Sequence, residues 1–577
     1  MSKQNQRLSV LPLSRRNPRT TISHATHLVS HPLKRLFEAS DDILAGLHED
    51  VMLRRIDRAM EWFGADRNLL TTLNPEHRNT PVFIGYLAQL VDTGDHVSPV
   101  IRELLGRLPK AARGKLPLND HIHLRLAEGI LELTGGNIES AIHHLDFVIS
   151  LGEDAIADRD VLALAHFWKA CCLHTRGKYD FALTHADRGR EIALQLGYPP
   201  IAAVMQVLQA RLHIRKDKLS RAMEMLREAE VVLRETDDLA SLGNIYSGYG
   251  SVALDEGRYE LAVEYFAKAI HSYGKLNPEH GSLARTLSSL AHAKRMISVR
   301  IAKQVDAHAE QRRRSAAGVT TEAVAPDGSA RLRVEHLREE ALSDLARADE
   351  IYRALGKQGG VGAVRIERGS LFVDSGDLEG AAAEANEAYE IGCTEKDYGV
   401  MAGARLLQSV IEKALYEEGI DEDPTQHAQL AHDYAKDGLT YAQQSEDRQI
   451  LARAYVYQGL ILCNEFFGNA DAAKECCQSA GELLISGNRD QLWEEYQVLA
   501  GKVLRTGSVD AKLRKWSQGL VENKTFQQMT EEFADLVIPS VWLREGRNVS
   551  RVVAKLSISP KKVRRILNRV GLKAAND

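Results

Sequence analysis

The chain has 577 residues, several times the length of a typical domain, so a single compact core is not expected. Hydrophobic residues make up 44% of the chain and charged residues 27%, as in ordinary folded proteins outside the membrane. Only 6% of the residues are aromatic, which argues against β-sandwiches and, with runs rich in Ala, Leu, Glu and Arg, favours helices packed through small residues.

Basic residues are concentrated at the two ends of the chain, although the net charge is only -5. Residues 1–37 contain no Asp or Glu, and residues 541–577 contain ten basic residues against two acidic ones. Residues 1–36 are therefore expected to form a disordered basic tail, with an organellar transit peptide as the alternative. Clustered positive charge at both ends favours contact with a polyanion.

Hydropathy and cysteine usage indicate the compartment. No apolar stretch reaches the length of a transmembrane helix, and the N-terminal residues lack the apolar core of a signal peptide. The six cysteines include no CxxC pair, and two adjacent pairs lie within amphipathic helical runs, which is typical of small buried residues in a reducing compartment. We expect a cytoplasmic protein without a membrane partner.

Four segments between residues 135 and 273 repeat one pattern. Each has a short break, usually at a glycine, followed by a polar turn and then by an alanine at a fixed offset. These alanines are separated by 41, 40 and 40 residues and are Ala141, Ala182, Ala222 and Ala262. A nearly constant period over four units is the signature of a repeat protein.

The repeated segments resemble the tetratricopeptide repeat. The family's small, turn and aromatic positions are met in the fourth unit by Gly250, Gly257, Tyr259, Ala262, Phe266 and Ala269. The third unit has Asp217 in place of the turn glycine, a mild departure because Asp tolerates left-handed backbone angles. The resemblance implies an all-α, right-handed helical solenoid. Its period is longer than the family's usual one and is more like that of sensor arrays in bacterial transcription regulators.

The array is predicted to cover residues 116–505, with about seven recognisable units. Residues 37–115 carry helical patterns and are expected to form an N-terminal capping region. A polar insert at about residues 306–333 has no apolar periodicity and is expected to be disordered. Residues 506–525 are expected to form a linker.

Residues 526–577 are predicted to form a small helix-turn-helix domain. Apolar residues keep helical spacing on each side of a short turn: Val549, Val552, Val553 and Leu556, then Val563, Ile566, Leu567 and Val570. Asn548 and Ser559 are placed to cap these two helices, and Pro560 suits a first helical position. The sequence resembles the Fis-type helix-turn-helix of bacterial enhancer-binding activators. It departs from that family at Ser557, which replaces a turn glycine, and at the two adjacent valines, which replace alanines.

The resemblance implies that the second helix of this domain binds DNA in the major groove. Lys561, Lys562 and Arg565 are expected near base edges, and Arg564 and Arg569 near phosphates, with Ser559 at the start of the helix. The alternative is a basic helix that docks on the acidic solenoid.

In the Fis family, the helices that precede this motif dimerise. The corresponding segment here carries an apolar stripe that favours a homodimer, with Pro539 breaking or kinking the helix; the stripe is Phe526, Met529, Phe533, Val537 and Val541.

The concave face of a solenoid, lined by the first helix of each unit, is the expected surface for a peptide or protein ligand. The polar residues predicted on this face are His174, Arg211, Arg215, Asn244, Ser251, Asp255 and Arg365. Asn can hold an extended peptide backbone and Arg can bind a carboxylate, and Asn244 resembles the groove asparagines of peptide-sensing regulators. The alternative is that these are simply solvated helix positions.

The sequence carries no recognisable catalytic motif. There is no phosphate-binding P-loop, no GxSxG, no HExxH and no calcium-loop pattern. The paired histidines, His121 with His123 and His143 with His144, diverge on a helix and do not predict a metal site. We expect a protein that is not an enzyme and needs no cofactor or metal. The leading hypothesis is a signal-responsive transcriptional regulator that binds DNA; the alternative is an adaptor whose basic C-terminus engages another protein or RNA.

Overall fold

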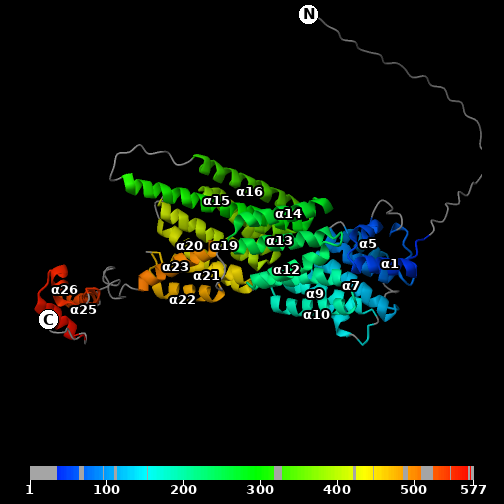
Figure 1. Cartoon of the computed structure of the whole chain (residues 1–577), viewed down its shortest axis with the longest axis horizontal. Coiled ribbons are helices and arrows are strands. Elements are labelled where there is room, and N and C mark those ends of the chain that lie inside the picture. The colour runs from blue at the N-terminus through cyan, green and yellow to red at the C-terminus, as the bar shows by residue number, and fades with distance from the viewer. Residues whose placement is uncertain are drawn as a thin grey trace, which may run out of the picture.

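The computed structural model describes residues 36–63, 70–94, 97–108, 114–152, 154–156, 158–316, 328–419, 424–445, 447–464, 466–484, 491–507, 524–545, 547–569 and 572. The predicted basic tail falls almost entirely outside these residues. The described residues form helices, apart from turns and one isolated β-bridge between Phe37 and Leu73. The protein is an all-α solenoid of the tetratricopeptide type, followed by a small helical unit (Figure 1).

Consecutive antiparallel helices build the solenoid. Its hairpins are α7 (Leu118–Thr134) with α8 (Ile138–Ser150), α9 (Arg159–Thr175) with α10 (Tyr179–Gln195), α11 (Pro199–Arg215) with α12 (Leu219–Leu233), α13 (Leu239–Asp255) with α14 (Tyr259–Leu276), α15 (Gly281–Ala316) with α16 (Gly328–Ala354), α17 (Gln358–Ser375) with α18 (Leu378–Glu395), α19 (Tyr398–Glu418) with α20 (Pro424–Ser445) and α21 (Arg448–Leu462) with α22 (Ala470–Leu483). Helix α23 (Gln491–Gly507) packs on the last hairpin. Each hairpin buries its apolar stripe against its neighbours, so one large core extends from the N-terminal region to α13 and a series of smaller cores continues along the later hairpins.

The predicted register is confirmed at its anchor residues. The four alanines of the repeat lie in the second helices of successive hairpins, and each is 0% exposed: Ala141, Ala182, Ala222 and Ala262. The turn residues Gly177, Asp217 and Gly257 all have positive φ, at 78°, 59° and 70°. Asp217 therefore adopts the left-handed backbone that its place in the repeat requires.

Gly250 shows why the repeat needs a small residue in the first helix. A Cβ atom at this position would lie 2.5 Å from the ring of Phe266, which is fully buried on α14. The absence of a side chain lets α13 and α14 approach closely enough for this ring to fill the space between them.

The N-terminal region consists of α1 (Asp41–Met52), α2 (Ile56–Met60), η1 (Glu61–Phe63), α4 (Thr80–Ala88), η2 (Gln89–Thr93) and α5 (Val97–Arg107). It contacts the first helices of several hairpins as well as its sequence neighbour α7. Tyr86 donates a hydrogen bond to Asp160 on α9 at 3.1 Å, and Trp168 on α9 donates to Gln89 at 2.7 Å. Arg54 reaches Asp238 at the start of α13, 184 residues away, at 2.7 Å. The region therefore covers part of the inner side of the array.

The predicted insert is shorter than its composition indicated. Helix α15 continues to Ala316 and α16 begins at Gly328, so helical structure occupies both ends of the predicted range 306–333. The alanine and arginine residues that dominate these ends have high helix propensity, which explains why low apolar periodicity did not prevent a helix. Residues 317–327 lie outside the described residues.

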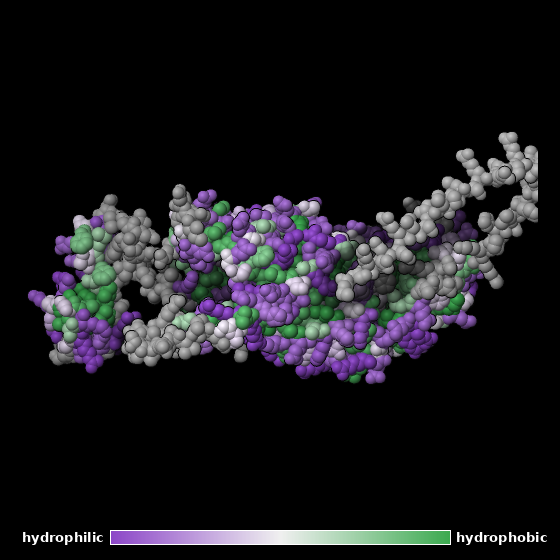
Figure 2. All heavy atoms as spheres, turned by 90° about the horizontal axis from the view of Figure 1, so that it is seen from above, coloured by the Kyte–Doolittle hydropathy of each residue, from purple (hydrophilic) through white to green (hydrophobic). Residues whose placement is uncertain are grey.

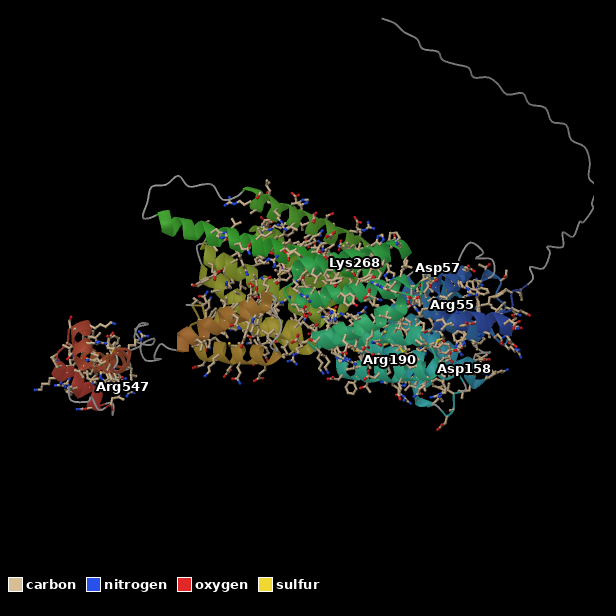
Figure 3. All side chains as sticks on the ribbon, viewed as in Figure 1. Arg55, Asp57, Asp158, Arg190, Lys268 and Arg547 are labelled. Atoms are coloured by element: carbon tan, nitrogen blue, oxygen red, sulfur yellow. The ribbon has the colours of Figure 1, made fainter. Side chains whose placement is uncertain are left out.

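Hydrophilic and hydrophobic side chains are unevenly distributed over the face that Figure 2 shows. In Figure 2 hydrophilic side chains cover most of the solenoid, and hydrophobic side chains show in the hollow along this face and on the C-terminal unit. Charged side chains project from all parts of the fold, including Arg55 and Asp57 in the N-terminal region (Figure 3). Within the described residues, no helix combines the length and apolar composition that crossing a membrane requires.

Candidate functional site

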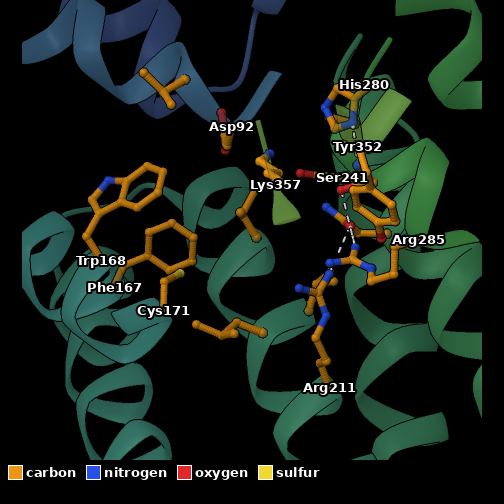
Figure 4. Close-up of a pocket in the computed structure, with 18 residues that line it drawn as sticks. Asp92, Phe167, Trp168, Cys171, Arg211, Ser241, His280, Arg285, Tyr352 and Lys357 are labelled. Carbon is orange, nitrogen blue, oxygen red and sulfur yellow. Dashed lines mark hydrogen bonds between the residues drawn. The ribbon is translucent and has the colours of Figure 1, made fainter. Parts of the chain in front are cut away.

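A cavity of about 350 Å³ lies between the N-terminal region and the inner helices of the solenoid (Figure 4). Its walls come from η2, α9, α11, the first turns of α13 and α15, and the turn that joins α16 to α17. Three helices, α13, α15 and α17, begin at or beside the cavity, so their positive N-terminal dipole ends face this space. The N-terminus of α13 is capped by the Asp238 carboxylate, so α15 and α17 supply the positive helix ends that remain.

Arg211, Arg285 and Asn244 form the polar side of the cavity. The Oδ1 atom of Asn244 accepts hydrogen bonds from the Arg211 guanidinium at 2.9 Å and the Arg285 guanidinium at 3.4 Å (Figure 4). It also accepts from the Tyr273 hydroxyl at 2.9 Å. Arg285 also donates to the Ser282 hydroxyl at 3.2 Å. One neutral amide oxygen thus serves three donors, two of which are cationic.

The two arginines lack an acidic partner. Neither forms an ion pair with a carboxylate in the part of the chain that the structure describes. Burial, with the nearby positive charge of Arg285, lowers the pKa of Arg211 to about 10, so this guanidinium still carries its charge at pH 7. Lys357 lines the same cavity and adds a third cation.

The pKa of His174 is lowered by the same excess of positive charge around Arg211 and Arg285. Burial lowers its pKa to about 3, and Arg211, Arg215 and Arg285 contribute in the same direction. The Nε2 atom of His174 is buried without a hydrogen-bond partner among the described residues. A neutral imidazole therefore lies beside the cationic cluster.

Apolar side chains form the opposite wall. Phe167 and Trp168 of α9 contact each other edge to face, with ring centroids 5.2 Å apart, and Val204, Val207 and Leu208 of α11 continue the surface. The hydrogen bond from the Trp168 indole to Gln89 fixes the larger ring in place. The cavity thus has a cationic side and a preformed aromatic side.

Asp92 places one acidic group at the edge of the cavity. Its Oδ2 atom accepts a hydrogen bond from Arg54 at 3.0 Å, and Arg54 also binds the fully buried Asp238. Burial raises the pKa of Asp92, whereas Arg54 acts in the opposite direction. Because Arg54 binds two carboxylates with a single positive charge, this edge of the cavity is more negative than the side formed by Arg211 and Arg285.

The predicted groove residues do not form one cluster. Arg211 and Asn244 line the cavity, and His174 lies within electrostatic range of its arginines. Arg215 instead lies 3.7 Å from Asp447 at the start of α21. Arg365 is bound to Glu384 at 3.0 Å and Glu387 at 3.1 Å, so its charge is compensated on α18.

Ser251 and Asp255 lie at the C-terminal end of α13, away from the cavity. The Ser251 hydroxyl donates to the backbone carbonyl of Ser247 within the helix at 3.0 Å. Sequence reasoning did not identify Trp168, Arg285 or Lys357. Trp168 lies on α9 with the predicted His174 but is not among the polar residues considered, and Arg285 and Lys357 come from a helix and a turn outside the predicted set. Arg285 could have been found from the sequence, because it is a cationic residue near the start of an inner helix.

The C-terminal unit consists of α25 (Phe526–Arg544), α26 (Val549–Leu556) and α27 (Pro560–Arg569), packed around a core of their own. The predicted caps are present: Asn548 accepts from the backbone N–H of Arg551 at 2.9 Å, and Ser559 accepts from that of Lys562 at 3.3 Å. Ser557 occupies the left-handed region at φ 51° and ψ 41°, which lets α26 end and the chain reverse within a few residues.

The cationic residues of α27 fall into two groups. Lys561, Lys562, Arg564 and Arg565 are exposed and form no ion pair with any described residue. Arg569 differs, because it is bound to Asp535 and to Glu531, 3.2 Å away, both on α25. It therefore holds α27 against α25, and its charge is compensated within the unit.

Helix α25 carries the predicted apolar stripe. Phe526 is 81% exposed and Phe533 is 48% exposed, whereas Val537 and Val541 are partly buried. The helix continues through Pro539 to Arg544, so this proline does not end it. Arg547 packs over the Trp542 ring, with 6.0 Å between the guanidinium carbon and the ring centroid.

Within the described residues, no three His, Cys, Asp or Glu side chains come together as a metal site. No family model matches the chain, and no curated protein sequence is significantly similar to it.

Similar solved structures include a Rap protein complexed with competence and sporulation factor, at 15% identity over 70% of this chain and 98% of that one, with a TM-score of 0.48. Another is the Rap conjugation gene regulator of plasmid pLS20 with the Phr* peptide, at 15% identity over 72% and 96%, with a TM-score of 0.40. A third is the human IFIT1 dimer with PPP-AAAA, at 12% identity over 78% and 96%, with a TM-score of 0.42.

Proposed function

We propose that this protein is a non-catalytic, signal-responsive transcriptional regulator. In this proposal the solenoid binds a peptide or protein partner, and α27 of the C-terminal unit binds DNA. The observation that carries it is the row of uncompensated cations on a capped helix that follows a tight turn. Positive charge in this arrangement suits the phosphates and guanine edges of a major groove.

The contrast between Arg569 and its neighbours sharpens the assignment. Arg569 satisfies its charge on α25, whereas Lys562 and Arg565 project from the exposed side of α27. A helix that served only to hold the unit together would be expected to pair its other cations in the same way. We therefore assign DNA contact to Lys561, Lys562, Arg564 and Arg565, with Ser559 capping the helix that presents them.

Exposed Phe526 and Phe533 support homodimerisation through α25. A twofold dimer would place two copies of α27 on the same side of a duplex and would recognise a palindromic site. Self-association through these two side chains would also remove exposed aromatic surface from water.

The test is an electrophoretic mobility shift across a salt series, with the full chain and a pool of random-sequence duplexes. We expect Lys562→Ala with Arg565→Ala to weaken binding at least tenfold and to lower the salt slope by about two, because two phosphate-range cations are lost. The matched control is Arg221→Ala with Arg227→Ala, which removes two exposed charges from α12 of the solenoid.

Absence of DNA binding at the lowest salt would contradict the proposal, as would equal losses in the two double variants. Preferential binding of RNA over duplex DNA, sensitive to the same α27 substitutions, would instead favour an adaptor with a basic nucleic-acid-binding end.

A further inference from the structure

We propose that the cavity between the N-terminal region and the inner helices binds a small organic molecule in which one carboxylate is attached to an apolar body. This inference rests on the proposed function, because it names the class of ligand that the solenoid would sense. The carboxylate would lie at Arg211 and Arg285, and the body would lie against Phe167 and Trp168.

The two arginines support the anionic group because neither has a carboxylate partner among the described residues. Each guanidinium has five N–H donors, and the hydrogen bonds of the two groups go to one amide oxygen and to the hydroxyls of Ser282 and Tyr273. Two like charges drawn to the same neutral acceptor repel each other, and a carboxylate between them would relieve this repulsion. A carboxylate also matches the fork of a guanidinium with two parallel hydrogen bonds.

The surrounding backbone favours the same ligand. Residues Ala240, Ser241, Gly281, Ser282 and Lys357 line the cavity at the starts of α13, α15 and α17. Helix N-termini stabilise negative charge, and here those of α15 and α17 add to the two guanidinium groups, whereas that of α13 is capped by Asp238. The anionic preference therefore rests on side chains and backbone independently.

The apolar wall and the volume define the rest of the ligand. A cavity of about 350 Å³ is near the lower limit for small-molecule sites and excludes a folded domain or a helix. Phe167, Trp168, Val207 and Leu208 offer a rigid apolar surface suited to an aromatic or branched aliphatic group. A lone inorganic anion would leave this wall unoccupied.

Asp92 limits the charge of the ligand. This carboxylate lines the cavity and shares Arg54 with Asp238, so a second negative charge on the ligand would face it unfavourably. Polyphosphates and dicarboxylates are therefore disfavoured relative to a monocarboxylate.

Calorimetric titration of the full chain tests the proposal. The probes are hydrocinnamate and its neutral isostere hydrocinnamamide, followed by L-phenylalanine and a short peptide ending in phenylalanine with either a free or an amidated C-terminus. We expect at least one carboxylate probe to bind and its neutral counterpart to bind at least tenfold more weakly. The order among the three carboxylates identifies the source as a simple acid, an amino acid or a peptide end.

Arg285→Gln and Arg211→Gln should each weaken binding of that carboxylate at least tenfold, whereas Arg221→Gln on exposed α12 should leave it unchanged. Removing one of two neighbouring cations relieves their repulsion and leaves no carboxylate without its cation, so the thermal midpoint of the ligand-free variants should not fall. Arg285 is exposed at the mouth of the cavity, so its variant is the safer of the two for folding.

Failure of every carboxylate probe to bind would overturn the inference, and so would equal binding by the isosteric amide or by the Arg285→Gln variant. These outcomes are separable from failure of the proposed function, because the mobility shift depends on α27 and is measured without any of these probes.

Discussion

At the scale of single residues, His174 shows how the cationic cluster acts on a group that does not line the cavity. Its imidazole is held neutral by burial and by three arginines, and its pKa falls to about 3. In the unfolded chain the same group has an ordinary pKa near 6.5, so acid protonates the unfolded state first.

We therefore predict that mild acid lowers the free energy of unfolding, because His174 is protonated in the unfolded chain before it is protonated in the folded one. Because its folded pKa is depressed, its contribution is fully present above pH 6.5 and is lost as the pH falls from 6.5 towards about 3. Between pH 7 and pH 5 the loss should be on the order of 1–2 kcal/mol, allowing for partial solvent access. Denaturant unfolding at both pH values measures it. His174→Gln should reduce the difference, whereas His143→Gln, at an exposed position, should not.

The cavity residues also show how much of the site could be predicted from the sequence. The repeat register alone identified Arg211 and Asn244, because a residue's place in a hairpin determines which way its side chain points. It did not identify Arg285 or Trp168, which enter the same cavity from other hairpins. Nor did it show that Arg365 would be satisfied by two glutamates, since that depends on the neighbouring helix.

At the scale of elements, the turn between α26 and α27 carries a measurable strain. Ser557 has a Cβ atom in the left-handed region, where a glycine is free of this penalty. We predict that Ser557→Gly stabilises the unit by about 0.5–1 kcal/mol, after the entropy that glycine adds to the unfolded chain is subtracted.

Hydrogen exchange of the α26 and α27 amides in the full chain measures this change, which should appear as slower exchange. Ser559→Ala provides the opposite control, because it removes the cap of α27 and should cost about 1 kcal/mol. Faster exchange in Ser557→Gly would show that the serine side chain stabilises the turn.

Most elements were predictable because their determinants are local. Alanine spacing, turn residues at positive φ and caps such as Asn548 act within a few residues of the helix they shape. The extension of α15 to Ala316 was missed because helix propensity persisted where the apolar stripe ended. The cavity was not predictable, since the N-terminal region must first fold onto helices far away in the sequence.

At the scale of the whole molecule, Arg54 ties the N-terminal region to the fourth hairpin of the array. Its side chain is 1% exposed and binds Asp238, which is fully buried and also caps α13 by accepting from the backbone N–H of Ser241 at 2.9 Å. Asp237 strengthens the same junction by accepting from the backbone N–H groups of Ile56 at 2.5 Å and Asp57 at 3.0 Å. This junction lies beside the cavity, because Asp92 belongs to both.

We predict that Arg54→Met destabilises the junction by about 3–5 kcal/mol, because the fully buried Asp238 and the partly buried Asp92 lose their shared cation. Hydrogen exchange should accelerate in α2, η2 and the first turn of α13 and stay unchanged in α21 and α22, since a solenoid transmits contacts mainly between neighbours. Arg55→Met, at a neighbouring position whose side chain is 41% exposed, is the matched control.

Adding Asp238→Asn to Arg54→Met should recover part of the loss, because one of the stranded charges is removed, and this coupling identifies the ion pair as the cause. Carboxylate binding should weaken in Arg54→Met but not in Arg55→Met, because η2 supplies one wall of the cavity. A uniform rise in exchange along the whole array would contradict the local junction and would mean that the N-terminal region stabilises every hairpin alike.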